Sequence, residues 1–323
     1  MCPQKPRQIA FQVLRRSARS ARFVDALLDA QVEKAGLCSA DRHLAQELAY
    51  GCVRWRATLD WLIARKAPTR PTPATQALLQ IGLYQIFWLD RIPNHAAVNE
   101  TVQLAHESGC SAQAGFINAV LRAYLREKDE TVRVLRELQS TQPALGWSHP
   151  GWLFERWRDR WGLDRTLQLL AWNNTPASTF ARVNALQTDA ASLLEQWRAE
   201  RVEFREVQRD WMPQATVFEL VSHPPLTSLP SFRQGFFYVQ DPSTLLAVRV
   251  LDPHPGESIL DLCAAPGGKT TYIAQCLGNH GRIMACDGSP DRLARLRDNC
   301  TRMNARCVTC RQTPPPRMFD RVL

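Results

Sequence analysis

A chain of 323 residues is too long for one ordinary hydrophobic core and predicts two or three domains. Its composition, 45% hydrophobic and 22% charged, is that of a globular protein; it has no apolar run of ~20 residues for a membrane span, and the lack of a secretion signal in residues 1–22 favours a cytoplasmic protein. Lys and Arg exceed Asp and Glu by 9, of which 6 fall within residues 1–150 (19 against 13), and such a surplus is compatible with contacts to phosphates.

The first part of the chain has the spacing of amphipathic helices. From residue 7 to about residue 138, apolar residues recur three or four positions apart, as in Ile9, Val13 and Leu14. Almost no stretch alternates with the period of two that is typical of strands. We therefore predict an all-helical domain over residues 1–140, and a linker at 142–150, where two prolines occur.

The next segment mixes helices and strands. Helical spacing appears first, and β-branched and aromatic runs follow beyond residue 176. The expected helices are 152–161, 163–173 and 189–201, and the expected strands are 180–186, 217–221 and 236–239. This mixture predicts a small α+β module over residues 150–240.

Strand–helix alternation begins at residue 258. The expected strands are 259–262, 282–286, 307–310 and 319–323, and the expected helices are 269–277 and 290–303. Repeated βα units with short loops predict a parallel, Rossmann-like α/β sheet over residues 241–323. About three such units are half of what this kind of sheet usually contains, so we expect an incomplete domain.

One short segment carries the sharpest chemical signal. Asp261-Leu-Cys-Ala-Ala-Pro-Gly-Gly-Lys-Thr270 lies where a strand turns into a helix, which is where α/β sheets bind ligands. Its small residues let a ligand approach the backbone, and the free amides at the helix start can hold a carboxylate or a phosphate. The predicted binding residues are Cys263, Ala264, Ala265, Pro266, Gly267, Gly268 and Lys269.

This loop lacks the residues typical of two common classes of nucleotide-binding loop, which favours a different ligand. A phosphate-binding P-loop needs a glycine where Cys263 stands, Pro266 removes an amide, and the dinucleotide fingerprint is absent. S-adenosylmethionine, which has a carboxylate and a ribose diol, fits better. Asp287 follows the second strand, 26 residues after Asp261, where an acidic side chain reaches ribose hydroxyls in related folds. The alternative role of Asp287 is that of a turn or helix-cap residue.

Several motifs together resemble a known family. Asp261–Thr270 resembles the cofactor motif of the RNA 5-methylcytosine methyltransferases of the NOL/NSUN/Sun group, and Tyr238–Ser243 and Arg182–Asn184 resemble segments that precede it. Glu47–Gly51 and Ile117–Arg122 are similar to parts of a NusB-like RNA-binding domain. The likeness covers almost the whole chain, and its domain pairing is similar to that of bacterial methyltransferases of 16S rRNA.

This resemblance implies a function and a set of roles. The expected cofactor is S-adenosylmethionine, bound by Cys263 to Lys269 with Asp287 on its ribose, and the expected reaction is methylation of carbon 5 of a cytosine in 16S rRNA. We expect RNA as partner, a monomer, and neither membrane nor metal. The cysteines that attack the base in the family would fall beyond residue 323, so we expect no catalytic residue in this chain and no activity from it alone.

Some residues depart from the family pattern or invite other roles. Thr313 stands where an acidic residue is expected near the adenine of the cofactor. We expect Cys263 to pack rather than react, and Cys307 and Cys310, even with Cys300 nearby, to bind no zinc, because no second pair or histidine completes a site. The tryptophans of residues 147–172 are expected to pack, although interleaved arginines would also suit base stacking.

Two other functions remain open. The chain could be an RNA-binding protein without catalysis, which keeps the helical domain and its affinity for RNA. It could also be a NusB-like transcription antitermination factor, an interpretation that rests on analogy of fold.

Overall fold

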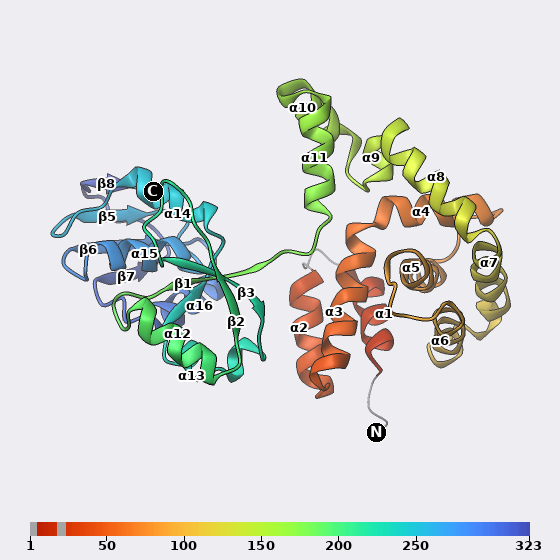
Figure 1. Ribbon diagram of the computed structural model, residues 1–323, viewed down its shortest axis with the longest axis horizontal. Helices are drawn as coiled ribbons and strands as arrows, with labels where there is room; N and C mark the ends of the chain where they lie inside the picture. The colour runs from red at the N-terminus through yellow and green to blue at the C-terminus, as the bar shows by residue number, and fades with distance from the viewer. Residues whose placement is uncertain (1–4, 18–23) are drawn as a thin grey trace. The chain divides into compact units, whose positions relative to one another are not determined.

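The structure is a computed structural model that describes residues 5–17 and 24–323 and divides the chain into two compact units, Met1–Thr175 and Pro176–Leu323 (Figure 1). Residues 1–4 and 18–23, which belong to the basic N-terminal segment, lie outside the described residues. Across the described ranges, no helix is both long and apolar enough to cross a bilayer.

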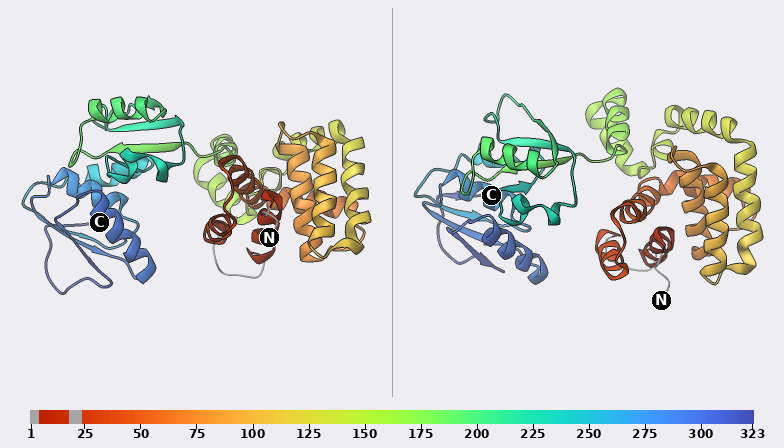
Figure 2. Two further views of the ribbon diagram at one scale, coloured as in Figure 1. Left: turned by 90° about the horizontal axis from the view of Figure 1, so that it is seen from below. Right: turned by 60° about the horizontal axis from the view of Figure 1, so that its bottom comes forward.

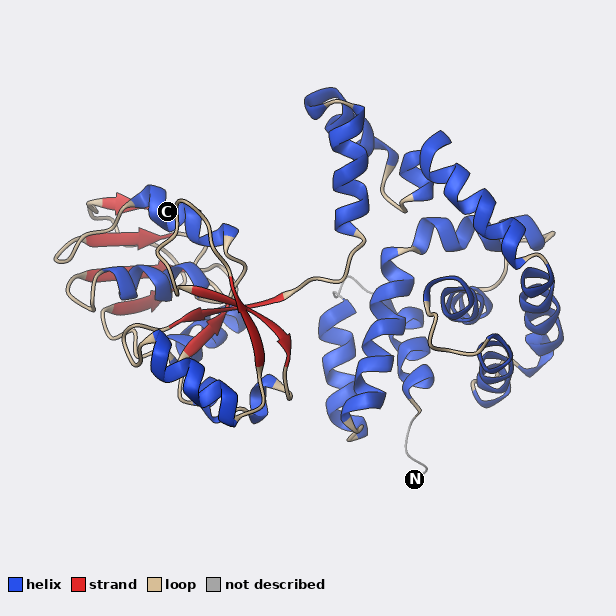
Figure 3. Ribbon diagram, in the orientation of Figure 1, coloured by secondary structure: helices blue, strands red, loops and turns tan. Residues whose placement is uncertain are grey.

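The first unit is built from helices, as the spacing of its apolar residues predicts (Figure 3). In chain order they are α1 Pro6–Ser17, α2 Val24–Ala35, α3 Ser39–Arg54, α4 Arg56–Lys66, α5 Pro73–Trp88, α6 Asn94–Glu107, η1 Ser111–Gln113, α7 Ala114–Arg126, α8 Lys128–Thr141, α9 Pro143–Gly146, α10 Gly151–Trp161 and α11 Leu163–Asn173.

Helix α5 occupies the centre of this unit. Its residues from Ala77 to Ile86 are all buried, and most of them are apolar, although Gln80 and Gln85 are among them. It contacts α1, α3, α4, α6 and α7, and Figure 1 shows it end-on among them. Thr72 caps its start by accepting a hydrogen bond from the amide of Thr75 at 3.3 Å. The core of the unit is therefore organised around the buried helix α5.

The segment predicted as a linker, 142–150, is instead ordered against α4. It contains the short helix α9, because Pro143 is suited to the first position of a helix. Thr58 donates to the carbonyl of Leu145 at 2.7 Å, and the amide of Ala57 donates to Ser148 Oγ at 2.9 Å. The division between the two units comes later, after α11.

The second unit begins with a four-stranded antiparallel sheet in the order β2-β3-β1-β4. Its elements are β1 Thr179–Val183, α12 Ala190–Ala199, β2 Glu203–Glu206, β3 Val217–Ser222, η2 Leu226–Ser228, α13 Pro230–Arg233 and β4 Phe237–Val239. Figure 2 shows α12 along one face of this sheet, where Trp197 packs on Phe218 and Phe237. Strand β2 was not predicted, since its Glu-Phe-Arg-Glu sequence has only one apolar residue and lies at the sheet edge.

A parallel sheet in the order β7-β6-β5-β8 follows in the same unit. Its elements are α14 Ser243–Leu251, β5 Ser258–Asp261, α15 Gly268–Cys276, β6 Arg282–Cys286, α16 Pro290–Arg302, β7 Val308–Arg311 and β8 Arg321–Val322. The alternation predicted from residue 258 is confirmed, and α14 is an additional helix. Pairing of Asp261 with Ala285 puts the ends of β5 and β6 at one edge.

The two sheets of the second unit share hydrophobic packing. Val207 and Val217, which belong to the antiparallel part, lie in the same buried cluster as Leu245 of α14 and Ile273 of α15. Side chains on the other face of the parallel sheet, such as Met284, form a small separate cluster. The strands therefore alternate between two buried surfaces, as their period of two requires.

Candidate cofactor site

The predicted binding residues come together at the edge where β5 and β6 end. Cys263 to Gly267 form the turn after β5, and Gly268 and Lys269 begin α15. Asp287 follows β6 directly, and its charge is close enough to act on the carboxyl group of Asp261. The loop and Asp287 therefore border one site, at the edge where parallel sheets bind ligands.

The loop is fixed by hydrogen bonds to its own carbonyl groups. Gly267 has a φ of +109°, a conformation that strongly favours glycine. Thr271 Oγ1 donates to the carbonyl of Gly267 at 2.7 Å. The carbonyl of Pro266 accepts from Asn299 Nδ2 at 2.9 Å and from the hydroxyl of Tyr238 at 3.2 Å. The backbone of the turn is thus held from α15, α16 and β4.

A buried cation supports the same loop from β1. Arg182 is fully buried and donates through Nε to Gln240 Oε1 at 3.0 Å, through Nη1 to Gln275 Oε1 at 2.5 Å and through Nη2 to Thr271 Oγ1 at 2.9 Å. Burial lowers the pKa of Arg182 to about 10, and all three acceptors are neutral. Its guanidinium also lies 4.9 Å from the ring centroid of Tyr272.

Asp261 holds an unpaired oxygen inside the site. Its Oδ2 accepts from Thr270 Oγ1 at 2.7 Å, whereas its Oδ1 is buried and has no hydrogen-bond partner among the described residues. Burial raises the pKa of the Asp261 carboxyl, and the nearby charge of Asp287 acts in the same direction. A buried acceptor without a partner is costly in a native protein and points to a polar group supplied by a ligand.

Asp287 is also nearly buried, at 6% exposure. Its Oδ1 accepts from the amide of Ser289 at 3.1 Å, which is the turn role considered above, and its Oδ2 lies 3.5 Å from Nη1 of the exposed Arg292. Because an Arg292 contact of this length is weak and solvated, Oδ2 remains available to a ligand hydroxyl.

The loop after β7 reaches the same edge. The amide of Asp287 donates to the carbonyl of Arg311 at 3.3 Å, and Gln312 Nε2 donates to the carbonyl of Gly288 at 3.2 Å. Thr313 follows these residues and is exposed. The position at which an acidic residue was expected thus lies on a loop attached to the Asp287 turn.

The structure corrects two expectations and bears on a third. Cys263 was expected to pack, but its side chain is exposed, because the turn directs it away from the core. Within residues 5–17 and 24–323, no three His, Cys, Asp or Glu side chains lie together as metal ligands would. Of the tryptophans, Trp147 packs near Trp55 as expected, whereas Trp152 and Trp172, which were also expected to pack, are 67% and 69% exposed.

These residues fit the chemical groups of S-adenosylmethionine. The first amides of α15 suit its carboxylate, Asp261 Oδ1 suits a donor such as its ammonium group, and Asp287 suits the ribose diol. Sequence reasoning did not assign Asp261, Arg182 or Gln240 to the site. Asp261 had a signal, since it ends the strand, but the other two reach the loop from distant elements.

Three families match successive parts of the chain. The NusB family matches residues 4–126, the ferredoxin-like domain of the RsmF/B-like methyltransferases matches residues 149–219, and the family 16S rRNA methyltransferase RsmB/F matches residues 248–323. The predicted fold class, a NusB-like helical domain followed by an α+β module and a methyltransferase domain, is confirmed. The boundaries 1–140, 150–240 and 241–323 stay a prediction.

Curated relatives extend over almost the whole chain. A probable ribosomal RNA small subunit methyltransferase B of Synechocystis is 32% identical over 98% of this chain and 73% of its own length. The protein of that name in Bacillus subtilis is 29% identical over 98% of this chain and 72% of its own length, and the ribosomal RNA small subunit methyltransferase B of Erwinia tasmaniensis is 35% identical over 92% and 67%.

One solved structure shares the fold over most of the chain. The crystal structure of PH0851 superposes with a TM-score of 0.71 at 22% sequence identity and covers 96% of this chain and 70% of that one. At this level of identity the likeness concerns the fold alone.

Proposed function

The chain belongs to the 16S rRNA methyltransferase RsmB/F family, and we propose that it directs a methyl group from S-adenosylmethionine to carbon 5 of a cytosine in 16S rRNA. The observation that carries the proposal is Oδ1 of Asp261, which is buried beside Asp287 where β5 and β6 end and has no hydrogen-bond partner in the part of the chain that the structure describes. The family membership supports methylation of ribosomal RNA, and this arrangement of Asp261 and Asp287 supports the assignment of the cofactor to it.

We assign the cofactor to the turn and to Asp287. Cys263, Ala264, Ala265, Pro266, Gly267, Gly268 and Lys269 line it with backbone and small side chains, and Asp287 accepts from ribose hydroxyls. The bound cofactor supplies a methyl group on a sulfonium sulfur, which an electron-rich carbon can attack. Asp261 and the α15 amides orient its amino-acid end, and Arg182 keeps the carbonyl of Gly267 in place through Thr271.

The target base needs its own activation, because carbon 5 of cytosine is a poor nucleophile. In the family a cysteine thiolate adds to carbon 6, and a proton leaves carbon 5 after methylation. We assign that thiolate to no residue of this chain, and Cys263 is given a binding role only. The base must also leave any stack in order to reach the cofactor.

The NusB-like unit supplies affinity for RNA in this proposal. Residues 1–150 carry a surplus of 6 basic residues, 19 against 13, and phosphate contacts from such residues weaken steeply as salt is raised. We further propose that the protein works as a monomer in the cytoplasm, where ribosomal RNA is assembled.

Two measurements test the proposal. Bisulfite sequencing of 16S rRNA from cells with and without the gene should show one cytosine that loses protection when the gene is removed. Calorimetry with the purified chain should show S-adenosylmethionine binding that Asp287→Ala weakens at least tenfold. Asp298→Ala is the matched control, because Asp298 is an exposed residue of α16.

The outcomes separate the alternatives. Unchanged 16S cytosines together with salt-dependent RNA binding would favour the RNA-binding protein without catalysis. Equal cofactor affinity in Asp287→Ala and Asp298→Ala would remove Asp287 from the site while leaving the family membership intact.

A further inference from the structure

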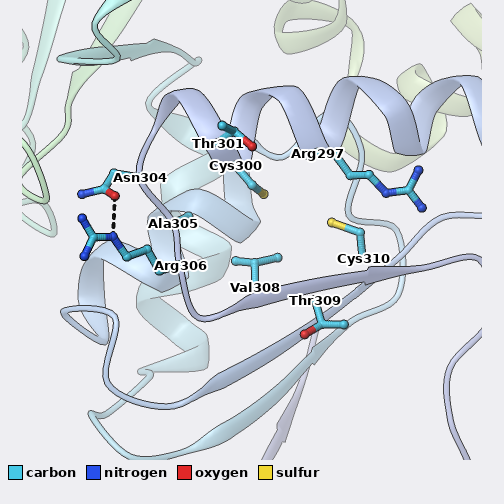
Figure 4. Close-up of a pocket in the computed structure, with 9 residues that line it drawn as sticks. All are labelled: Arg297, Cys300, Thr301, Asn304, Ala305, Arg306, Val308, Thr309 and Cys310. Carbon is cyan, nitrogen blue, oxygen red and sulfur yellow. Dashed lines mark hydrogen bonds between the residues drawn. The ribbon is translucent and has the colours of Figure 1, made fainter.

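A cavity lies between the last turns of α16 and the strand β7, apart from the residues assigned to the cofactor. It has a volume of about 630 Å³, and its lining includes Cys300, Cys310 and Arg297 (Figure 4). None of its lining residues belongs to the loop 263–269, and Asp287 is not among them. The cavity therefore needs an explanation of its own.

Two thiols face each other in this cavity. Cys300 comes from α16 and is 8% exposed, whereas Cys310 comes from β7 and is partly exposed. Figure 4 shows their sulfur atoms directed toward one another, with the guanidinium group of Arg297 on the side of Cys310. The pair thus consists of one accessible thiol and one sheltered thiol behind it.

The surroundings make the accessible thiol the nucleophile. The neighbouring thiol of Cys300 lowers the pKa of Cys310 to about 7, and the charge of Arg297 acts in the same direction. The same contact raises the pKa of Cys300, which keeps its proton. The cavity lining contains Arg297 and Arg306 and no acidic residue, so it favours an anionic reactant.

We propose that Cys310 and Cys300 form a thiol–disulfide exchange site for small disulfides that carry carboxylates, of which oxidised glutathione is the test case. The proposal stands on the cavity, the facing sulfur atoms and the two arginines, and it is independent of the methyltransferase function.

The exchange proceeds in two steps whose atoms balance. The Cys310 thiolate attacks one sulfur of the small disulfide, forms a mixed disulfide and releases one thiolate. Cys300 then gives its proton to solvent, because no thiolate of Cys310 remains beside it, and its sulfur attacks Sγ of Cys310. A Cys300–Cys310 disulfide forms and a second small thiol leaves. The protein pair is oxidised, and the small disulfide is reduced to two thiols.

Trypsin makes the product easy to identify. Cleavage after Arg297, Arg302, Arg306 and Arg311 places Cys300 in the peptide 298–302 and both Cys307 and Cys310 in the peptide 307–311. A Cys300–Cys310 bond therefore joins two peptides, whereas a Cys307–Cys310 bond stays inside one.

The experiment treats the folded chain with oxidised glutathione near neutral pH, quenches with acid, and maps unreduced peptides by mass spectrometry. The expected product is the joined pair 298–302 and 307–311, which disappears in Cys310→Ser. Cys300→Ser should instead accumulate a glutathione adduct on Cys310, because Cys300, the thiol that would resolve the adduct, is absent. Cys307→Ser is the matched control and should still give the joined pair.

Three results would overturn the proposal. They are a bond within 307–311, an adduct on exposed Cys38 or Cys263 while Cys310 stays reduced, or a joined pair that forms only after denaturation. Circular dichroism of each serine variant shows whether its fold is retained, and a variant that fails this check is replaced by the alanine version.

Discussion

Nη2 of Arg182 donates to Oγ1 of Thr271 at 2.9 Å, and the same Oγ1 donates to the carbonyl of Gly267 at 2.7 Å. A strand of the antiparallel sheet thereby holds the cofactor turn of the parallel sheet. The relay passes through a single hydroxyl, so the guanidinium acts on the turn without touching a ligand. Arg182 is accordingly a positioning residue.

Replacement of Arg182 by Met should weaken S-adenosylmethionine binding about tenfold or more. The change leaves Gln240, Gln275 and Thr271 without their donor, and lost buried hydrogen bonds to a charged group cost about 1.5–3 kcal/mol each. Hydrogen exchange of the amides from Gly267 to Thr271 should accelerate in parallel. The control is Leu193→Ala, which destabilises the same unit from a fully buried site in α12. Equal affinity in the two variants would reduce Arg182 to a purely structural role.

Because the Asp261 carboxyl is buried, we expect an unusual dependence of the stability on pH. Its pKa is raised above 3.8 in the folded chain, so its ionised form costs stability at neutral pH. That cost falls as the pH drops through the raised pKa and vanishes below the unfolded value. The unfolding free energy of the wild type, minus that of Asp261→Asn, should therefore increase on going from pH 7 toward pH 4. Urea titrations at several pH values measure this difference in unfolding free energy. A difference that stays constant or decreases from pH 7 toward pH 4 would contradict a buried, ionised carboxylate.

The Cys310 thiol should react with iodoacetamide at unusually low pH. Its pKa is lowered to about 7 by the neighbouring thiol of Cys300 and then by the charge of Arg297. The other titratable groups around the pair are Cys286 of β6, Cys307 and Asp261. The rate of alkylation should be half-maximal near pH 7. In Cys300→Ala the midpoint should move up toward the ordinary value of 9.0, since the donor is gone. Alkylation of the exposed Cys38 in the same samples is the control for the reactivity of iodoacetamide at each pH.

Gly51 tests the packing of the helical unit. A Cβ at this position of α3 would lie 2.0 Å from Cζ of Tyr84, whose hydroxyl donates to Glu47 Oε1 at 2.6 Å. Gly51→Ala should therefore lower the unfolding free energy by about 1–3 kcal/mol, the usual cost of overpacking. Gly115→Ala in α7 meets no atom within 4 Å and should leave stability unchanged or slightly higher. Similar melting temperatures for the two variants would mean that Tyr84 can move aside.

The sequence predicts best those elements whose neighbours are local. Strand β6 has the predicted bounds, Arg282–Cys286, because an apolar run between turns decides both its type and its ends. Helix α14 was not predicted, because its apolar residues do not form one clear stripe and Val250 is 78% exposed. The cofactor turn was found from its own glycines. Arg182 lies 89 residues from Thr271, so no spacing within the motif could reveal their hydrogen bond.

The packing of Val207 and Val217 with Leu245 and Ile273 has a practical consequence for dissection of the chain. Family boundaries invite a cut near residue 240, between the antiparallel module and the methyltransferase part. Such a cut would split one hydrophobic core and expose the guanidinium of Arg182 to water. Both halves would then be expected to aggregate when made alone. A cut after Thr175 separates two sets of internal contacts, so a fragment beginning at Pro176 is the smallest piece in which the cofactor turn keeps all of its supports.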